Sequence, residues 1–227
     1  MLIQPHDISS PKIYFRIISL VPSLTELLYY LDLEEEVLAI TKFCVRPARW
    51  HITKTRIGGT KNVNIALIKQ LSPDLIIANK EENVKEQVEL LSKDCDVFVS
   101  DVSNLSDALN TISSIGRLTG KISAASELYN QIQRKFSGLA EKESLKQKIR
   151  ATYLIWRHPY MTVGGDTFIN DMMAYCGIEN VYRDSKRYPQ IELEDLKTKQ
   201  CDLVILSSEP YLLKKSISMK FTHHFLV

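Results

Sequence analysis

Two segments of the chain carry the same order of hydrophobic and polar positions. Residues 65–79 read Ile-Ala-Leu-Ile-Lys-Gln-Leu-Ser-Pro-Asp-Leu-Ile-Ile-Ala-Asn, and residues 193–207 read Leu-Glu-Asp-Leu-Lys-Thr-Lys-Gln-Cys-Asp-Leu-Val-Ile-Leu-Ser. In each, apolar residues spaced three and four apart give way to a continuous apolar run, which predicts a short helix, a break and a buried strand. The copies stand 128 positions apart, as Asp74 and Asp202 do.

A second pair of segments supports an internal duplication. Residues 28–33 (Leu-Tyr-Tyr-Leu-Asp-Leu) resemble residues 173–178 (Met-Ala-Tyr-Cys-Gly-Ile). Two similar α/β halves suggest two lobes that face one cleft, and such a cleft is a common place for a small ligand. The alternative is that any two units of one helix and one strand look alike.

The rest of the pattern also alternates between strands and helices. Strands are predicted at 16–20, 37–40, 97–99 and 151–156, and helices follow Pro22 and cover 84–91, 105–118 and 168–175. Residues 43–64 between them are expected to be irregular. Ser23 and Glu26 form a capping box for the first helix. Asp166 or Thr167 caps the helix at 168–175, and Gly177 ends it.

Residues 121–148 form the longest predicted helix, because Gly138 is the only glycine or proline in them and apolar residues recur at helical spacing. A helix that joins two lobes is favoured by its place between the repeat copies; a surface helix of one domain is the alternative. The fold class is α/β, with two Rossmann-like lobes of parallel strands. The N-terminal lobe covers 1–120, the long helix 121–148 and the C-terminal lobe 149–227.

The second lobe is expected to be incomplete. The first lobe continues from Ala78 to Lys121, enough for a further helix, strand and helix, whereas only 21 residues follow Leu206. Residues 214–227 show no helical or strand period. The strand at 203–206 is then an edge that lacks part of its cover, unless this tail packs against it.

Composition excludes several classes of function. The chain has 227 residues, 44% hydrophobic and 25% charged, which is ordinary for a globular protein. A net charge of +2 does not favour nucleic-acid binding. The apolar runs are too short to span a bilayer, and residues 1–10 show no signal peptide, so the chain as written is expected to be cytoplasmic. Its four scattered cysteines predict small core residues instead of a zinc or redox site.

No catalytic constellation is visible, and neither a catalytic residue nor a metal site is predicted. The pairs Gly58-Gly59 and Gly164-Gly165 lack the spacing of phosphate-binding loops. His51 and His158 stand alone, and His223-His224 lie in the patternless tail. An enzyme would need titratable groups that converge on one site.

Aromatic and cationic residues gather in loops that follow the predicted strands. They are Phe43, Arg46 and Trp50, then Trp156, Arg157 and Tyr160, then Tyr182, Arg183, Arg187 and Tyr188. Ligands of open α/β sheets bind beyond the carboxyl ends of the strands. Aromatic faces with a few arginines suit a large, flat, partly anionic ligand. The alternative is that each of these residues only packs locally.

Several separated motifs resemble those of the cobalamin-type periplasmic binding proteins. They are Arg-Ile-Ile-Ser-Leu-Val-Pro-Ser-Leu-Thr-Glu-Leu at 16–27, Arg-Ile-Gly-Gly at 56–59, the first repeat copy, Cys-Gly-Ile-Glu-Asn-Val-Tyr-Arg-Asp-Ser at 176–185 and Tyr-Pro-Gln-Ile at 188–191. The resemblance covers residues 15–212. It implies two α/β lobes joined by one long helix, a monomer that binds a corrinoid, iron-siderophore or haem between its lobes and delivers it to the permease of an ABC transporter. Family members carry no cofactor and are exported to the periplasm or cell surface.

The resemblance also places individual residues. It puts Phe43, Arg46, Thr60, Asn79 and Tyr188 on the ligand cleft. Cobalamin binders of the family tend to carry tryptophan at the last three of these positions. This chain has none there, which leaves related chelates open as ligands.

One glutamate on each lobe of the family pairs with arginines of the permease. Glu194 occupies one of these positions, and Ala66 occupies the other. The two positions are equivalent in the 128-residue repeat. A single charge can still dock the protein, but the loss of its pair should weaken electrostatic steering. The hypothesis of another class is a cytoplasmic two-lobed α/β enzyme that acts on a tetrapyrrole or a nucleotide-sugar.

Overall fold

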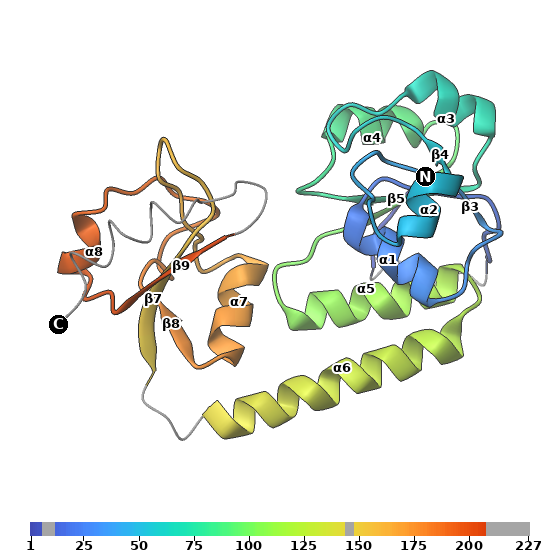
Figure 1. Cartoon of the computed structure of the whole chain (residues 1–227). Helices are drawn as coiled ribbons and strands as arrows, with labels where there is room; N and C mark the ends of the chain where they lie inside the picture. The colour runs from blue at the N-terminus through green and yellow to red at the C-terminus, as the bar shows by residue number, and fades with distance from the viewer. Residues whose placement is uncertain (6–11, 144–147, 208–227) are drawn as a thin grey trace. The chain divides into compact units, whose positions relative to one another are not determined.

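Strands and helices alternate along the chain, as the pattern predicts (Figure 1). The structure is a computed structural model that describes residues 1–5, 12–143 and 148–207. The chain divides into a first unit of Met1–Asp101 with Asp107–Gln131, and a second unit of Val102–Ser106 with the chain from Ile132 on. The predicted tail at 214–227 lies outside the described residues.

The first unit contains one parallel sheet with the strand order β1-β6-β5-β2-β3-β4. Its strands are β1 (Leu2–Ile3), β2 (Ile17–Ser19), β3 (Val37–Ile40), β4 (Thr55–Arg56), β5 (Leu75–Asn79) and β6 (Asp96–Ser100). Its helices include α1 (Pro22–Tyr30), α2 (Ala48–Thr53), α3 (Ile65–Leu71) and α4 (Lys85–Leu91). Right-handed crossovers place α1 and α2 on one face of the sheet and α3 and α4 on the other (Figure 1). Both faces are therefore covered, which explains the continuous apolar runs of β2 and β5.

Two further helices cross the division between the units. They are α5 (Leu105–Leu118) and α6 (Ile122–Glu143), which is one continuous helix through Gly138. None of the described helices is both long and apolar enough to cross a membrane.

The second unit contains a smaller parallel sheet with the strand order β8-β7-β9. Its elements are β7 (Ile149–Leu154), α7 (Phe168–Tyr175), β8 (Ile178–Asn180), α8 (Asp195–Thr198) and β9 (Leu203–Leu206). Apolar residues pack on both faces of this sheet. One cluster includes Leu154, Ile191 and Leu196, and the other includes Ala151, Val163 and Met173.

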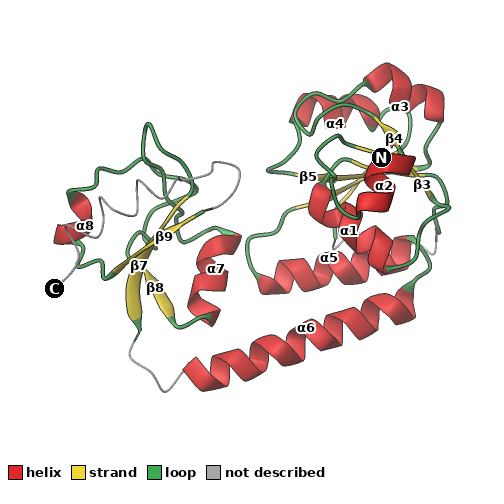
Figure 2. Cartoon of the chain, in the orientation of Figure 1, coloured by secondary structure: helices red, strands yellow, loops and turns green. Residues whose placement is uncertain are grey.

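The structure confirms the internal duplication. The order β5-β2-β3 of the first unit repeats as β9-β7-β8 in the second, and both sets of strands are parallel. Helices α3 and α8 precede β5 and β9 at the 128-residue spacing (Figure 2). The second pair of similar segments also agrees, because α1 leads to β3 as α7 leads to β8.

Side-chain contacts repeat as well. The Arg16 guanidinium donates to the carbonyl oxygens of Leu71 and Ser72 at the end of α3. The Arg150 guanidinium donates to those of Lys199 and Gln200, 128 positions later, at 2.8 and 3.1 Å. A cation at the end of a helix satisfies its last carbonyl groups.

The repeated aspartates have a matching role. Asp74 accepts hydrogen bonds from the backbone N–H groups of Phe15 and Arg16 at 2.9 and 2.8 Å. Asp202 accepts one from the N–H of Arg150 at 3.1 Å. In each unit the aspartate that precedes the repeat strand, β5 or β9, therefore binds the backbone near the start of the neighbouring strand, β2 or β7.

Several local predictions were wrong. Pro22 is the first residue of α1, Val21 is its N-cap without a side-chain cap, and Ser23 is exposed inside the helix, so the capping box does not form. The stretch 43–64 is not irregular throughout, because it contains α2 and β4. The caps of α7 are confirmed: the Thr167 hydroxyl accepts from the N–H of Asn170, and Gly177 follows the helix with φ 71°.

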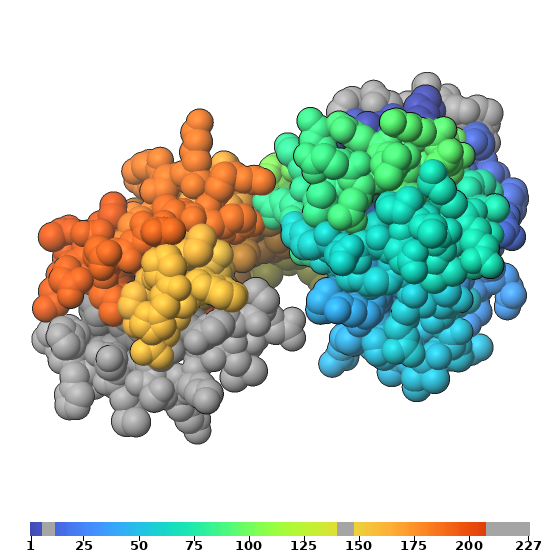
Figure 3. Space-filling model, turned by 90° about the horizontal axis from the view of Figure 1, so that it is seen from above, coloured from blue at the N-terminus to red at the C-terminus, as the bar shows by residue number. Residues whose placement is uncertain are grey.

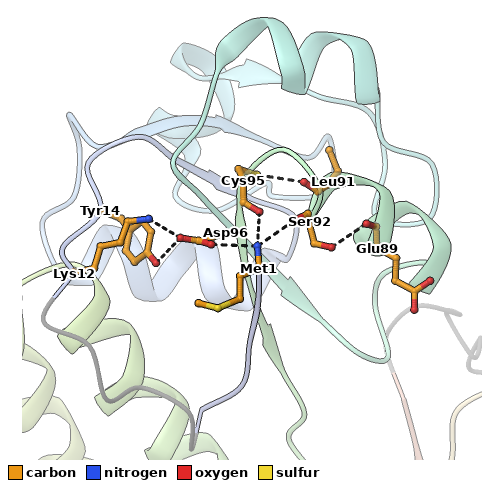
Figure 4. A network of polar contacts seen from close by, with 8 residues as sticks. All are labelled: Met1, Lys12, Tyr14, Glu89, Leu91, Ser92, Cys95 and Asp96. Carbon is orange, nitrogen blue, oxygen red and sulfur yellow. Dashed lines mark hydrogen bonds and ion pairs between the residues drawn. The ribbon is translucent and has the colours of Figure 1, made fainter.

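The Asp96 carboxylate, at the start of β6, contacts three donor groups (Figure 4). Its carboxylate lies 2.6 Å from Nζ of Lys12, accepts a hydrogen bond from the Tyr14 hydroxyl at 2.9 Å and lies 3.2 Å from the amino group of Met1. The same amino group donates to the carbonyl oxygens of Ser92 and Cys95. Burial raises the pKa of Asp96, but the hydrogen bonds from Lys12, Tyr14 and the amino terminus outweigh it and lower that pKa below its ordinary value.

Asp96→Asn is expected to destabilise the protein by about 1–3 kcal/mol at pH 7, because the partners of this carboxylate lose their charged acceptor. Because the pKa of Asp96 is lower in the folded protein, this carboxylate stabilises the fold at pH values above the ordinary aspartate pKa near 4. The contribution is lost as the pH falls through the lowered pKa. The difference between the variant and the wild type should therefore shrink on acidification. Urea unfolding of both proteins at pH 7 and below pH 4 measures this difference in unfolding free energy.

Asp94→Asn is the matched control. Asp94 pairs with Lys69 at 2.9 Å, but both side chains are about half exposed. A surface pair of this kind contributes at most about 1 kcal/mol. Equal losses in the two variants would contradict the role given to Asp96.

Candidate functional site

The strands of the first unit run parallel, so the segments that follow them meet at one edge of the sheet. We call the segments 41–47, 57–63 and 79–84, which follow β3, β4 and β5, the first rim. It contains four of the five predicted ligand residues. The cyan to teal part of the chain, which includes α2, α3 and α4 as well as these segments, forms one continuous area of the face of the first unit seen in Figure 3.

Phe43 presents an aromatic face on the first rim. Its side chain is 52% exposed, and Nζ of Lys42 lies 5.2 Å from the ring centre. The ring rests against Gly59, where an added Cβ would lie 3.1 Å from a ring carbon. The glycine thus allows the ring to lie close to the backbone, and the exposed side of the ring can stack on a flat ligand.

Asn79 and Thr60 have structural partners on the same rim. The Asn79 amide donates to the hydroxyl and the carbonyl oxygen of Ser100 at 3.0 and 3.2 Å. Its Oδ1 accepts from the N–H groups of Glu81 and Glu82 at 2.9 and 3.1 Å. Thr60 is buried. Asn79 therefore stabilises the rim, and Thr60 offers a ligand little exposed surface.

Arg46 is exposed, and the structure does not bring it into one cavity with the other three. It lines a surface groove of about 1280 Å³ between α1 and α2. The exposed Tyr29 and Tyr30 line the same groove, whereas Phe43, Thr60 and Asn79 do not.

Tyr188 lies in the second unit, in a segment that runs beside residues 162–164. The N–H of Thr162 donates to Pro189 at 3.1 Å, and that of Gly164 donates to Arg187 at 2.7 Å. These bonds bracket Tyr188, whose half-buried ring packs against the cluster of Ala151, Val163 and Met173. We call residues 155–165 and 181–191, which follow β7 and β8, the second rim.

Glu194 is exposed at the N-cap of α8, and its side chain makes no cap hydrogen bond. Its predicted position at the start of a helix is confirmed. Ala66 lies in the first turn of α3, the equivalent helix of the first unit. The carboxylate at Glu194 is therefore available to a partner molecule.

Two aromatic residues assigned to the loops are in fact core residues. Trp50 is fully buried, and its Nε1 donates to Glu34 at 2.6 Å. Tyr182 is 5% exposed, and burial raises its pKa to about 12. Trp156 remains 40% exposed. The expectation that all four cysteines are core residues holds for Cys44 and Cys201, whereas Cys95 is partly buried and Cys176 is exposed.

The sequence did not point to two buried asparagines, Asn83 and Asn180. The side chain of Asn83 connects segments within the first rim, and that of Asn180 connects segments within the second rim. Each is an asparagine at or shortly after the carboxyl end of a strand, but asparagines in loops are common and this signal is weak. Within residues 1–5, 12–143 and 148–207, no three His, Cys, Asp or Glu side chains gather to form a metal site.

Comparison with known proteins agrees with this fold. The family model described as periplasmic binding protein matches residues 17–222. A vitamin B12-binding protein of Vibrio parahaemolyticus is 25% identical over 194 residues, which cover 85% of this chain and 70% of that protein.

Solved structures show the same fold. The periplasmic vitamin B12 binding protein BtuF of Vibrio cholerae has a TM-score of 0.78 at 23% identity and covers 92% of this chain and 84% of its own. IsdE of Staphylococcus aureus, solved with heme, has a TM-score of 0.78 at 20% identity and covers 93% and 85%. The chain therefore belongs to the periplasmic binding protein family, as a substrate-binding protein of ABC import and not an enzyme.

Proposed function

We propose that the ligand is a corrinoid of the cobalamin type, captured for uptake by the permease of an ABC importer. The observation that carries this proposal is the half-exposed Phe43 ring, held on Gly59 at the carboxyl ends of the strands. A flat macrocycle offers such a ring a large apolar surface. The vitamin B12-binding relatives support the same class of ligand.

Phe43, Arg46, Thr60, Asn79 and Tyr188 remain the proposed ligand residues. Phe43 would stack on the macrocycle, and the exposed Arg46 would pair with an anionic substituent. Asn79 would act mainly through the backbone that its side chain holds, and Thr60 through its own backbone, whose carbonyl oxygen accepts from Asn83. Tyr188 would contribute an aromatic edge from the second rim.

Haem or an iron-siderophore is the second candidate class. By the resemblance, cobalamin binders of the family tend to carry tryptophan where this chain has Thr60, Asn79 and Tyr188, so its rims are expected to differ from theirs. Structural relatives with the same fold include IsdE complexed with heme and a possible iron-binding protein of Staphylococcus epidermidis. We further propose that the protein acts in the periplasm or at the cell surface, since relatives are described as periplasmic.

Titration of the purified protein with cyanocobalamin, dicyanocobinamide, haemin and a ferric siderophore tests the ligand class. Calorimetry is expected to give a Kd below about 100 µM for a corrinoid, which corresponds to about 5.5 kcal/mol. Haemin or siderophore binding without corrinoid binding would favour the second class. If none of the four binds, the proposed function is wrong.

Phe43→Ala should weaken binding about tenfold, because the ring is the exposed aromatic surface that the first rim offers. Phe15→Ala is the control, since Phe15 is also an exposed phenylalanine but lies at the amino end of β2. An equal loss of affinity in both variants would argue against the first rim as the binding surface.

A further inference from the structure

Asn83 joins three segments at the carboxyl ends of the strands. Its side-chain Nδ2 donates to the carbonyl oxygens of Thr60 at 3.0 Å and Leu20 at 3.4 Å. Its Oδ1 accepts from the N–H of Asn79 at 2.8 Å. These partners follow β4, follow β2 and end β5, respectively. One side chain therefore connects the ends of three strands that are far apart in sequence.

The contacts of Asn83 are buried, and solvent cannot easily replace them. The residue is only 8% exposed, and its two amide hydrogens and its oxygen all have partners. A buried donor or acceptor that loses its partner carries a desolvation cost. The three segments are thus coupled: none can move without leaving a polar group of another unpaired.

The coupled segments carry Thr60 and Asn79, two of the proposed ligand residues, and lie against a third, Phe43. Thr60 directly follows Gly59, on which the Phe43 ring rests. Asn79, whose N–H is held by Asn83, in turn holds the N–H groups of Glu81 and Glu82. Gln87 adds a second brace, because it accepts from Val63 and donates to the Lys61 carbonyl oxygen. The segments 57–63 and 79–84 of the first rim are therefore held together by the side chains of Asn79, Asn83 and Gln87.

Asn180 has the corresponding role in the second unit. It is 3% exposed, its Nδ2 donates to the Val163 carbonyl oxygen at 2.9 Å and its Oδ1 accepts from the N–H of Tyr182 at 3.0 Å. Val163 lies in the segment bonded to residues on both sides of Tyr188. Asn180 thus links the two segments that form the second rim.

We propose that Asn83 and Asn180 are positioning residues that hold the two rims in the ligand-binding conformation before the ligand arrives. Binding then avoids the entropic cost of ordering these loops. The proposal rests on the proposed function, because it assigns ligand contact to the rims. In this proposal Asn83 and Asn180 do not contact the ligand, but they affect its affinity by holding the loops that do.

The variant that isolates this role is Asn83→Asp, which has nearly the same shape. It keeps the acceptor for Asn79 but, at neutral pH, loses both donors and turns a carboxylate oxygen toward two carbonyl oxygens. The introduced carboxyl, buried beside those oxygens, is expected to hold its proton at mildly acidic pH and then to donate one hydrogen bond again.

The matched control is Asp74→Asn. Asp74 precedes β5, whereas Asn79 ends it, so the control removes one of the two carboxylate oxygens that accept backbone hydrogen bonds at the amino ends of the strands. Both variants should lower the melting temperature by several degrees. Only Asn83→Asp should disturb the first rim.

Two measurements separate a positioning role from a general loss of stability. Hydrogen exchange without ligand should become at least tenfold faster at the amides of Val63, Glu81 and Glu82 in Asn83→Asp and stay unchanged there in Asp74→Asn. Calorimetry with the tightest of the four probes should give a Kd at least tenfold weaker at pH 8 and within about threefold of the wild type at pH 5.

The outcomes are distinguishable. If the wild type binds no probe, the proposed function fails, and exchange at the three amides alone decides whether Asn83 holds the rim. If the wild type binds a probe and Asn83→Asp has the same Kd and exchange, the positioning role is refuted and the proposed function stands. Weaker binding of equal size in Asp74→Asn would also refute it, since a general loss of stability would then explain both.

Discussion

Glu194→Arg is expected to abolish transport while the affinity for the ligand stays unchanged. Glu194 is exposed at the N-cap of α8 and does not cap the helix, so its carboxylate can face a partner. The equivalent position in the first unit is Ala66, so under the proposed function this single charge would pair with arginines of the permease. Reversing this charge should slow the encounter with the permease, because the introduced arginine would face the arginines of the permease. Uptake of the labelled ligand and binding to the reconstituted permease measure the effect.

Glu192→Arg is the control for this experiment, because it makes the same charge change at an exposed position two residues earlier. It should reduce uptake only slightly. Ala66→Glu should instead speed association with the permease, since it restores a paired charge, and this gain should fade in high salt. Normal uptake by Glu194→Arg would leave this residue with only a helix-terminal role, in which a carboxylate is favourable by about 0.3–1 kcal/mol.

Gly165→Ala is expected to destabilise the second unit by about 1–3 kcal/mol or more, because the added Cβ has no space. That atom would lie 2.0 Å from the carbonyl oxygen of Arg183 and 3.0 Å from its carbonyl carbon. Both are backbone atoms, so the chain itself must move. The movement would strain the hydrogen bond from the Gly165 N–H to Ser185, which measures 2.9 Å. Thermal unfolding should show a lower Tm, by about 2–4 °C for each kcal/mol in a chain of this size.

Gly138→Ala is the matched control for the glycine substitution. Gly138 lies inside α6, and nothing stands within 4 Å of a Cβ placed there. Alanine favours the helix over glycine by about 1 kcal/mol, so this variant should raise the Tm. A stabilised Gly165→Ala, or two variants with equal Tm, would show that the close approach to Arg183 does not exist in solution.

Elements with a long, regular pattern were predictable from the sequence. The bounds of α5 and β3 agree with the predicted ones, and α3, β5, α8 and β9 appear where the repeat places them. The reason is that several turns of a helix or a buried strand each impose a period on their residues. Short elements impose none. β1, β4 and β8, with two or three residues each, are strands because a neighbouring strand pairs with them.

Burial of single side chains was less predictable. Trp50 follows a proline-containing loop and resembles a ligand contact, yet it packs inside the first unit, where Tyr29 meets its ring edge-on and Glu34 accepts from its nitrogen. An aromatic residue in a loop has the same local sequence whether it faces solvent or the core. The difference arises from helices that only the tertiary structure brings together.

The sequence by itself determined the duplicated α/β architecture, the family motifs and the exposed Glu194, because each depends on residues close together or on a pattern that repeats. The tertiary structure decided how the rims are held. Asn83 bonds to Leu20, 63 positions earlier, and Arg150 bonds to Gln200, 50 positions later. Such contacts leave no period and no local composition. They depend on which strand ends become neighbours, and the strand order of the sheet alone determines that.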